Sequence, residues 1–296
     1  MVRIATRASR LARWQADWVK TRLADLGVAS ELVLVETQGD REQAPFAAMD
    51  GQGFFTKAVQ DAVLAGRADL AVHSYKDLPS EPAAGLEVAA VSERADPRDV
   101  IVARPDAIDD EGPHLPLRQG VLIGTSAARR RAQLMHLRPD LRLGELRGNV
   151  PTRVERLRNG DFGAVILAAA GLERLQLDLS GVSFRPLDPR EFLPAPAQGS
   201  LALEIRREDH ELASILTDIH DVQAHRTVAA ERGLMAMIHG GCQLALGCHA
   251  ALDGDRVTLE AFFEGRRASA THASSEGAAM LVFEGLGRPR PREVLG

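Results

Sequence analysis

Cysteine, lysine and aromatic residues are all scarce in this chain. Only two of the 296 residues are cysteines, Cys242 and Cys248, which excludes a secreted fold built on a disulfide framework. Aromatic residues make up 4% of the chain, and lysine supplies only three of the 36 Lys and Arg residues. A GC-rich genome is sufficient to explain so much arginine, so only position can indicate which arginines bind a ligand.

Long apolar runs and an excess of positive charge are missing as well. The longest apolar stretch, residues 164–172, is far shorter than the roughly 20 residues that a membrane helix needs. The formal net charge of -5 argues against a general nucleic-acid binder. The N-terminus has no apolar signal segment, so we expect a cytoplasmic protein without membrane or nucleic-acid partners. A P-loop and a G-x-S-x-G elbow are both absent from the sequence.

What is present is typical of a folded protein of two or three domains, with 45% hydrophobic and 26% charged residues. In the first part of the chain, apolar runs alternate with segments of helical spacing. We expect strands at 2–6, 31–36, 68–73, 86–91 and 99–103, and helices at 10–26 and 54–64. Leu11, Trp14, Trp18 and Leu26 are expected to face inward from the first helix. Such alternation predicts an α/β fold with a mostly parallel sheet.

The alternation resumes after a polar loop and then changes character. We expect strands at 121–123, 141–146, 164–168 and 201–206, and helices at 127–137 and 151–158. Segments 3–9 and 122–126 each end a strand with hydroxyl residues and open a helix, which indicates two α/β units built on one plan. The Pro-containing segment 194–199 predicts a hinge or crossover. A helix at 222–238, three strands near 248, 257 and 268, and a helix at 275–286 predict a small α+β domain.

Three predicted strand-to-helix turns carry the same kinds of residue. They are Thr6 to Ser9 with Arg7, Gly124 to Ser126 with Arg129 and Arg130, and Arg147 to Arg153 with Asn149. Each offers unpaired helix N–H groups, hydroxyl or amide side chains, and arginine, a combination that suits anions. In open α/β sheets, ligands gather at these strand ends. The alternative is that the hydroxyl and amide groups are ordinary helix caps and the arginines are solvated.

A further predicted strand ends in a polar turn that contains His73, Ser74, Lys76 and Asp77. An ionised Asp77 could stabilise a developing cation or pass a proton. The alternative is a surface ion pair at the end of a strand.

Cys242 follows two glycines and is expected in a loop where its thiol is accessible, although a buried inert cysteine is the alternative. Cys248 lies in an apolar run and fits the inert alternative better. His239, Cys242, Cys248 and His249 do not have the spacing of a common zinc site, so we expect no metal.

Together these residues resemble the porphobilinogen deaminase (hydroxymethylbilane synthase) family. The resemblance covers essentially the whole chain. It is carried by the segments 3–9, 14–15, 71–77, 93–99, 124–126 with 129–130, 146–149, 167–172 with 174, 198–199 and 240–243. Many separate motifs in the same order exclude a chance match.

The resemblance implies a transferase of tetrapyrrole (haem) biosynthesis that joins four porphobilinogen molecules head to tail and releases ammonia. It implies a dipyrromethane cofactor attached to Cys242 by a thioether, and no metal. The implied fold has two periplasmic-binding-protein-like α/β domains, at 1–93 with 195–212 and at 94–194, and a small α+β domain at 213–296. It also implies a cytoplasmic enzyme, and we expect a monomer.

Residue roles follow from the resemblance alone. Asp77 matches the family's catalytic aspartate. The residues implied for cofactor binding are Cys242, Lys76, Ser126, Arg129, Arg130, Arg147, Asn149 and Arg153. The residues implied for substrate binding are Arg7, Ser9, Gln15, Phe55, Ser74, Arg174 and Gln198. The arginines suit a growing chain that carries acetate and propionate groups on every ring.

Four positions depart from the family pattern. Ala48 and Gln52 stand where the family usually has basic residues, Ala127 replaces a serine and Ala197 replaces a glycine. The two lost cations predict slower elongation or a different role for that loop, not an inactive enzyme. A binding protein without catalysis and a degenerate relative that binds porphyrin precursors remain the alternative functions.

Overall fold

The computed structural model describes residues 1–35, 56–112, 114–238 and 244–289. The chain divides into two compact units, each of which is built from two segments. Unit 1 comprises Met1–Arg94 and Ser200–Arg226, and unit 2 comprises Ala95–Gly199 and Thr227–Gly296. The predicted breaks fell after residues 93, 194 and 212, and the separate third domain from 213 stays a prediction.

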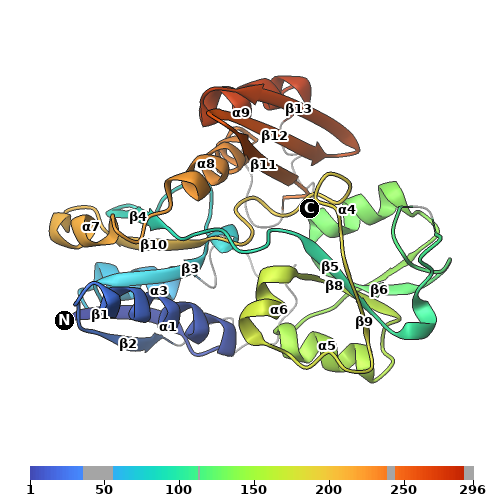
Figure 1. The fold of residues 1–296 in the computed structure, drawn as a ribbon, viewed down its shortest axis with the longest axis horizontal. Coiled ribbons are helices and arrows are strands. Elements are labelled where there is room, and N and C mark those ends of the chain that lie inside the picture. Colours follow the sequence, from blue (N-terminus) through green and yellow to red (C-terminus); the bar gives the residue numbers. More distant parts are fainter. Residues whose placement is uncertain (36–55, 113, 239–243, 290–296) are drawn as a thin grey trace, which may run out of the picture. The chain divides into compact units, whose positions relative to one another are not determined.

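Unit 1 is organised around a five-stranded sheet (Figure 1). In spatial order its strands are β2 (Ser30–Val35), β1 (Val2–Arg7), β3 (Leu70–Ser74), β10 (Leu201–Arg206) and β4 (Leu86–Val91). Its helices are α1 (Arg10–Asp25), α3 (Lys57–Leu64) and α7 (His210–Leu216), with a short 3-10 helix, η2 (Tyr75–Asp77). β1 runs parallel to β2 and β3, whereas β10 is antiparallel to both β3 and β4.

Helices cover both faces of this sheet. Successive side chains of a strand point to opposite faces, so a strand of apolar residues needs a packing partner on each side. Leu70 and Val72 of β3 belong to the apolar cluster that includes residues of α1 and α7. Ala71 lies between them and belongs to the cluster that includes Val59 and Val63 of α3. The strand is therefore apolar on both faces, as its continuous hydrophobic run indicates.

The larger sheet of unit 2 repeats this plan. Its order is β7 (Arg142–Gly144), β6 (Leu122–Gly124), β8 (Ala164–Ala168), β5 (Asp99–Ala103) and β9 (Ser183–Pro186). Its helices are α4 (Ala128–Leu137), α5 (Val150–Arg158) and α6 (Ala169–Leu175), and η3 (Pro105–Ala107) follows β5. β6 is parallel to β7 and β8, and β5 is antiparallel to β8 and β9. The predicted common plan of the two α/β units is confirmed.

Fewer strand pairs in these two sheets are parallel than the sequence predicted. In each sheet two of the four strand pairs are parallel and two are antiparallel. The reversed strands are β10 and β5, and neither is joined to its neighbour in the sheet by a strand–helix–strand connection. The parallel rule for alternating strands and helices therefore does not apply to them.

The C-terminal part of unit 2 is a three-stranded antiparallel sheet with two helices (Figure 1). The elements are α8 (Val222–Met237, whose first residues belong to unit 1), β11 (Gly247–Asp253), β12 (Arg256–Phe263), β13 (Arg266–His272) and α9 (Ser275–Gly285). Val257 and Leu259 of β12 pack with Ala278 and Val282 of α9 in one apolar cluster. The predicted α+β character of this region is confirmed.

The sequence predicted the buried face of α1 only in part, since Trp18 packs against the apolar cluster of the sheet but two other expected residues are exposed. Trp14 is 37% exposed and Leu26, just after the helix, is 40% exposed, although both were expected to face inward. The helix buries Ala16, Val19 and Leu23 instead. Bulk and hydrophobicity favoured the tryptophan, but the i, i+3, i+7 spacing of the three buried residues defines the face in contact with the sheet.

Among the described residues, none of the helices is both long enough and apolar enough to cross a membrane.

Candidate functional site

The predicted site residues of unit 1 lie where its parallel strands end. Arg7 is the last residue of β1, and Ser74 is the last residue of β3. η2 follows directly and carries Lys76, which is half-buried, and Asp77, which is exposed. Because β1 and β3 are parallel neighbours, their carboxyl ends meet at the same edge of the sheet, where open α/β sheets bind ligands.

Two residues predicted to contact substrate are in contact with each other. The Gln15 Nε2 group of α1 donates to the Ser74 hydroxyl at 2.7 Å. Gln15 is 3% exposed, so this bond ties the end of β3 to the first helix. Ser9 caps α1, accepting the Ala12 N–H at 3.3 Å. The cap is the alternative interpretation of this turn, and it is compatible with a ligand at the same helix end.

In unit 2, Ser126 joins the two turns that follow β6 and β7. Its hydroxyl donates to the Leu146 carbonyl at 3.0 Å and accepts the Leu146 N–H at 3.1 Å. Asn149 caps α5, since its Oδ1 accepts the Thr152 N–H at 3.0 Å and the Thr152 hydroxyl at 2.8 Å. Ser126 and Asn149 thus form hydrogen bonds that stabilise the shape of these neighbouring turns. The positive charge at these turns comes from the arginines.

Gly148 allows the turn that carries two of those arginines. Its φ of +99° is a left-handed conformation, and a Cβ there would meet Thr152 Cγ2 at 2.9 Å. Arg153 Nε donates to the Gly148 carbonyl at 2.8 Å. Arg147, before the glycine, is half-buried and donates to Glu145 at 3.2 Å. The turn after β7 therefore holds two guanidinium groups near one sharp bend.

Arg129 and Arg130 are buried and share a single carboxylate, Asp99, at the start of β5. Arg129 Nη1 donates to Asp99 Oδ2 at 2.7 Å, and Arg130 Nη2 donates to Asp99 Oδ1 at 2.8 Å. Gln198 Nε2 also donates to Asp99 Oδ1, at 2.9 Å. The structure thus brings Gln198 together with the arginine pair, from which it was predicted separately. We call Asp99, Arg129, Arg130 and Gln198 the Asp99 cluster.

The Asp99 cluster carries one more positive than negative charge. Burial alone would raise the pKa of Asp99, but the guanidinium groups of Arg129 and Arg130 outweigh it and hold that pKa well below its ordinary value. Burial lowers the pKa of Arg129, against the opposing effect of Asp99. A buried net cation is costly without a counter-charge, so the cluster favours an anionic ligand beside it.

Arg174, on α6 after β8, is a further cation at these strand ends. Its Nη2 donates to the Gly199 carbonyl at 2.6 Å. Burial lowers the pKa of Arg174 to about 10, which the negative charge of Glu173 opposes. A ligand carboxylate beside this guanidinium would compensate that burial.

Asp99 is the member of the Asp99 cluster that was not among the predicted site residues. The available signal is a carboxylate that opens the otherwise apolar strand Asp99–Ala103, where every residue is buried. An acidic residue at the end of a fully buried strand requires a cationic partner, and Arg129 and Arg130 of α4 supply it.

Cys242 and Phe55, and the departures at Ala48 and Gln52, lie outside the described residues. The described residues contain no group of three or more His, Cys, Asp or Glu side chains placed to hold a metal ion.

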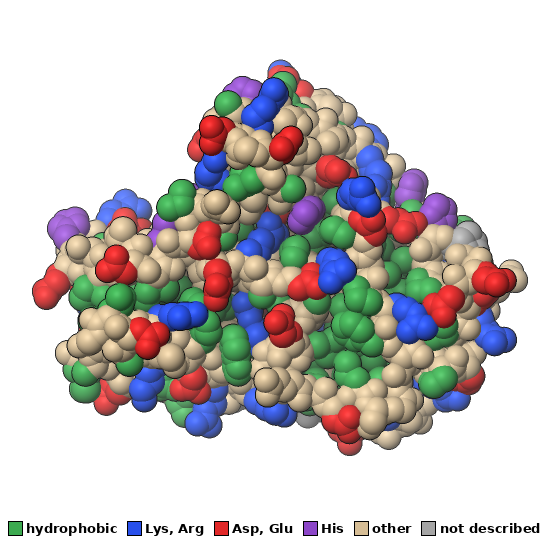
Figure 2. Space-filling view, viewed as in Figure 1, with side chains coloured by type: hydrophobic (Ala, Val, Ile, Leu, Met, Phe, Trp, Pro, Cys, Tyr) green, Lys and Arg blue, Asp and Glu red, His purple; other side chains and the backbone are tan. Residues whose placement is uncertain are grey.

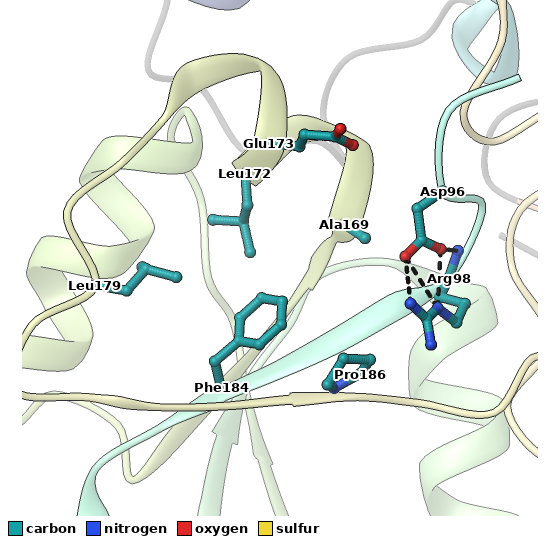
Figure 3. A pocket seen from close by; sticks show the side chains of 8 residues that line it. All are labelled: Asp96, Arg98, Ala169, Leu172, Glu173, Leu179, Phe184 and Pro186. Carbon is teal, nitrogen blue, oxygen red and sulfur yellow. Dashed lines mark hydrogen bonds and ion pairs between the residues drawn. The ribbon is translucent and has the colours of Figure 1, made fainter. Parts of the chain in front are cut away.

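A cavity of about 330 Å³ lies elsewhere in unit 2 (Figure 3). Its lining is mostly apolar, with Leu172, Phe184 and Pro186, and the ion pair of Asp96 and Arg98 stands at one side. None of the predicted site residues lines it. We therefore place the candidate site at the strand ends, where the charges are, and not in this cavity.

Charges of both signs are interspersed over the face of the molecule shown in Figure 2. Position at the strand ends, rather than a broad basic surface, distinguishes the arginines of the candidate site.

Comparison with known proteins identifies the family of this chain. Residues 2–214 match the protein-family model described as "Porphobilinogen deaminase, dipyromethane cofactor binding domain". The chain belongs to the porphobilinogen deaminase family. It is 41% identical over 300 residues to the porphobilinogen deaminase of Syntrophobacter fumaroxidans, covering 100% of this chain and 92% of that protein. It is 43% identical over 264 residues to that of Trichlorobacter lovleyi, covering 88% and 82%.

Solved structures give a weaker likeness. The periplasmic VFT2 domain of Bordetella pertussis BvgS matches with a TM-score of 0.45 and 18% identity, covering 78% of this chain and 91% of that domain. A likeness this distant carries no argument. The α/β architecture of this porphobilinogen deaminase family member rests on its own two sheets and their common strand order.

Proposed function

We propose that this protein is a hydroxymethylbilane synthase, which condenses four porphobilinogen molecules head to tail with release of ammonia. The observation that carries the proposal is family membership over most of the chain, together with cationic and acidic groups at the ends of the parallel strands. We further propose a cytoplasmic monomer without nucleic-acid or membrane partners, as expected from the sequence.

The arginines bind the carboxylates of the substrate. Porphobilinogen and its oligomers carry an acetate and a propionate on each ring, so a growing chain brings many carboxylates to one site. Arg147 and Arg153 offer guanidinium groups at the turn after β7, and the Asp99 cluster supplies one net positive charge at the start of α4. Charge-assisted hydrogen bonds from arginine are short and directional, so they orient each ring as well as hold it.

The cofactor expected for the family fits the donor set in unit 2. A dipyrromethane carries four carboxylates, and the strand ends of unit 2 provide a surplus of buried and half-buried arginine. Bound covalently, it supplies the first pyrrole position to which substrate is added. We propose that Cys242 attaches it and that Lys76, Ser126, Asn149 and the arginines at 129, 130, 147 and 153 hold its carboxylates.

Asp77 is the proposed catalytic residue. It is exposed at the end of η2, directly after β3, so its carboxylate is accessible to a ligand at the strand ends. Loss of ammonia from porphobilinogen leaves a cationic carbon conjugated with the pyrrole nitrogen. An ionised carboxylate near that nitrogen stabilises the cation, and the same group can guide the protons that leave during coupling.

Substrate-side contacts are proposed for Arg7, Ser9, Gln15, Phe55, Ser74, Arg174 and Gln198. Of these, Gln198 contacts Asp99 and Gln15 contacts Ser74, so both also support neighbouring site residues.

Turnover of porphobilinogen by Asp77→Asn tests the mechanism. We expect kcat to fall by at least about a hundredfold with the protein still folded, because charge stabilisation in the transition state is lost. Asp77→Glu should retain a measurable part of the activity. Asp17→Asn, at an exposed position on α1, serves as the matched control and should leave kcat unchanged. Full turnover by Asp77→Asn would contradict the assignment.

A further inference from the structure

A buried polar network lies beneath the turn that carries Asp77. Glu204 of β10 is 2% exposed, and its carboxylate accepts hydrogen bonds from two side chains. Gln60 Nε2 of α3 donates to Glu204 Oε1 at 3.1 Å and to Oε2 at 3.0 Å. His73 Nε2 of β3 lies 3.2 Å from Glu204 Oε2. The three residues come from a helix and two adjacent strands, and none belongs to the site described above.

Burial makes these contacts necessary. His73 is 5% exposed and Gln60 is 8% exposed, so water does not replace either partner. A buried carboxylate without donors costs several kcal/mol. When Glu204 is ionised, His73 Nε2 must carry the proton of their hydrogen bond. The side chain of His73 is thereby fixed to β10, one residue before Ser74 and four before Asp77.

Backbone hydrogen bonds and a side chain of α1 also contact the segment around η2. The Tyr75 N–H donates to the Ser200 carbonyl at 3.0 Å, and the Leu78 N–H closes the turn on the Tyr75 carbonyl at 3.2 Å. Gln15 holds Ser74 from the α1 side. Leu70 and Val72 pack in the apolar cluster that includes residues of α1 and α7, and the bond from His73 is a side-chain tie on the opposite face of β3. It joins the end of β3 to both β10 and α3.

We propose that His73, Glu204 and Gln60 form a positioning network that sets the location of η2 and hence of the Asp77 carboxylate. The proposal rests on the proposed function, because it gives the network a role in the reaction through Asp77. His73 touches neither substrate nor cofactor in this account. Its contribution is to keep the carboxylate within the narrow range of positions where it stabilises a developing charge, since a displacement of about 1 Å can cost about a hundredfold in rate.

Three variants of the complete protein test this proposal through steady-state kinetics with porphobilinogen and through urea unfolding. His73→Met keeps the volume but removes the donor, and we expect kcat to fall about tenfold with KM within about twofold. His73→Gln restores an amide donor, and its kcat should recover to within about threefold of the parent. Val72→Ala, the neighbouring residue on the other face of β3, should lose stability while the folded enzyme keeps its kcat.

If His73→Met does not fold, Gln60→Met on α3 removes the other donor to Glu204. It should likewise lower kcat about tenfold and leave KM within about twofold. The proposal is overturned if the His73 or Gln60 variant loses stability like Val72→Ala but keeps its kcat. Asp77→Asn separates the proposed positioning network from the proposed catalytic role of Asp77. An inactive Asp77→Asn with a fully active His73→Met refutes only the positioning network, whereas a fully active Asp77→Asn refutes the proposed role of Asp77 itself.

Discussion

The two α/β sheets each bury a carboxylate on the corresponding strand, but they compensate it differently. β10 in unit 1 and β5 in unit 2 occupy the same place in their sheets, fourth in order and antiparallel to the third strand. Glu204 on β10 is held by a glutamine and a histidine. Asp99 on β5 is held by two arginines and a glutamine.

The position along the strand explains the difference. Glu204 lies opposite Ala71, in the middle of β3, and is 2% exposed. Asp99 lies opposite Ala168, the last residue of β8, at the edge where ligands bind. A network in the interior needs only to satisfy its carboxylate, whereas a cluster at the edge can hold a surplus cation for an incoming anion. One plan thus provides a neutral hydrogen-bond network around the carboxylate in unit 1 and a pair of arginines around it in unit 2, where we propose that an anion binds.

The largest expected effect comes from removing the charge of Asp99. Asp99→Asn leaves two buried guanidinium groups without their counter-ion, and we expect a loss of about 3–5 kcal/mol in the free energy of unfolding. Glu204→Gln removes a charge whose donors are an amide and an imidazole, so its loss should be about 1–3 kcal/mol. Urea unfolding of both variants followed by circular dichroism measures the difference. Equal losses would mean that the two clusters are equivalent.

Acid should affect an ion pair of unit 1 in a defined pH window. Hydrogen bonds from Arg3, with a contribution from Arg206, lower the pKa of Asp69 from 3.8 to about 2. A lowered folded-state pKa means that this stabilisation is complete above about pH 4 and is lost as the pH falls towards 2. Asp69→Asn should remove that part of the acid sensitivity, on the order of 1 kcal/mol, since solvent screens a partly exposed pair. Urea midpoints between pH 5 and 2 that fall as steeply in the variant would contradict this.

Helix capping differs between the two units and can be exchanged. Ser9 caps α1 with a side-chain bond, but Ala127 at the corresponding start of α4 provides none. The backbone of Ala127 is extended (φ -74°, ψ 118°), as a capping residue requires. Ala127→Ser should therefore stabilise the protein by about 1 kcal/mol, and Ser9→Ala should destabilise it by a similar amount. Thermal unfolding of the pair checks both signs, and a neutral Ala127→Ser would show that α4 is capped by other means.

The smallest expected effect is at Ala197, where the resemblance implies a glycine. Its φ is +61°, which is strained for a residue with a Cβ, and its N–H donates to buried Glu231 at 2.7 Å. Ala197→Gly should relieve that strain and stabilise the protein by about 0.5 kcal/mol, after allowance for the greater entropy of the unfolded glycine. A decrease in stability would show that the Cβ makes a contact worth more than the strain.

Apolar patterns and the order of motifs in the sequence predicted most helices and strands and the family. The contacts between charged side chains could not be predicted from the sequence. The apolar run that forms β8 and the strand-like run near 257 that forms β12 predicted their elements directly. The exposed Trp14 shows that hydrophobicity alone does not identify the buried face of a helix. The contact between Gln198 and Asp99 joins residues 99 positions apart, and nothing in the local sequence encodes it. β9, the edge strand Ser183–Pro186, was missed because it is short and half polar.

The intact mass of the purified protein under denaturing conditions tests the central claim most directly. The proposed function predicts a covalent excess equal to two linked pyrrole units in the parent protein and its loss in Cys242→Ser, with Cys248→Ser as the matched control that keeps it. An unmodified parent that stays unmodified after incubation with porphobilinogen would contradict the account and favour a protein that only binds its ligand.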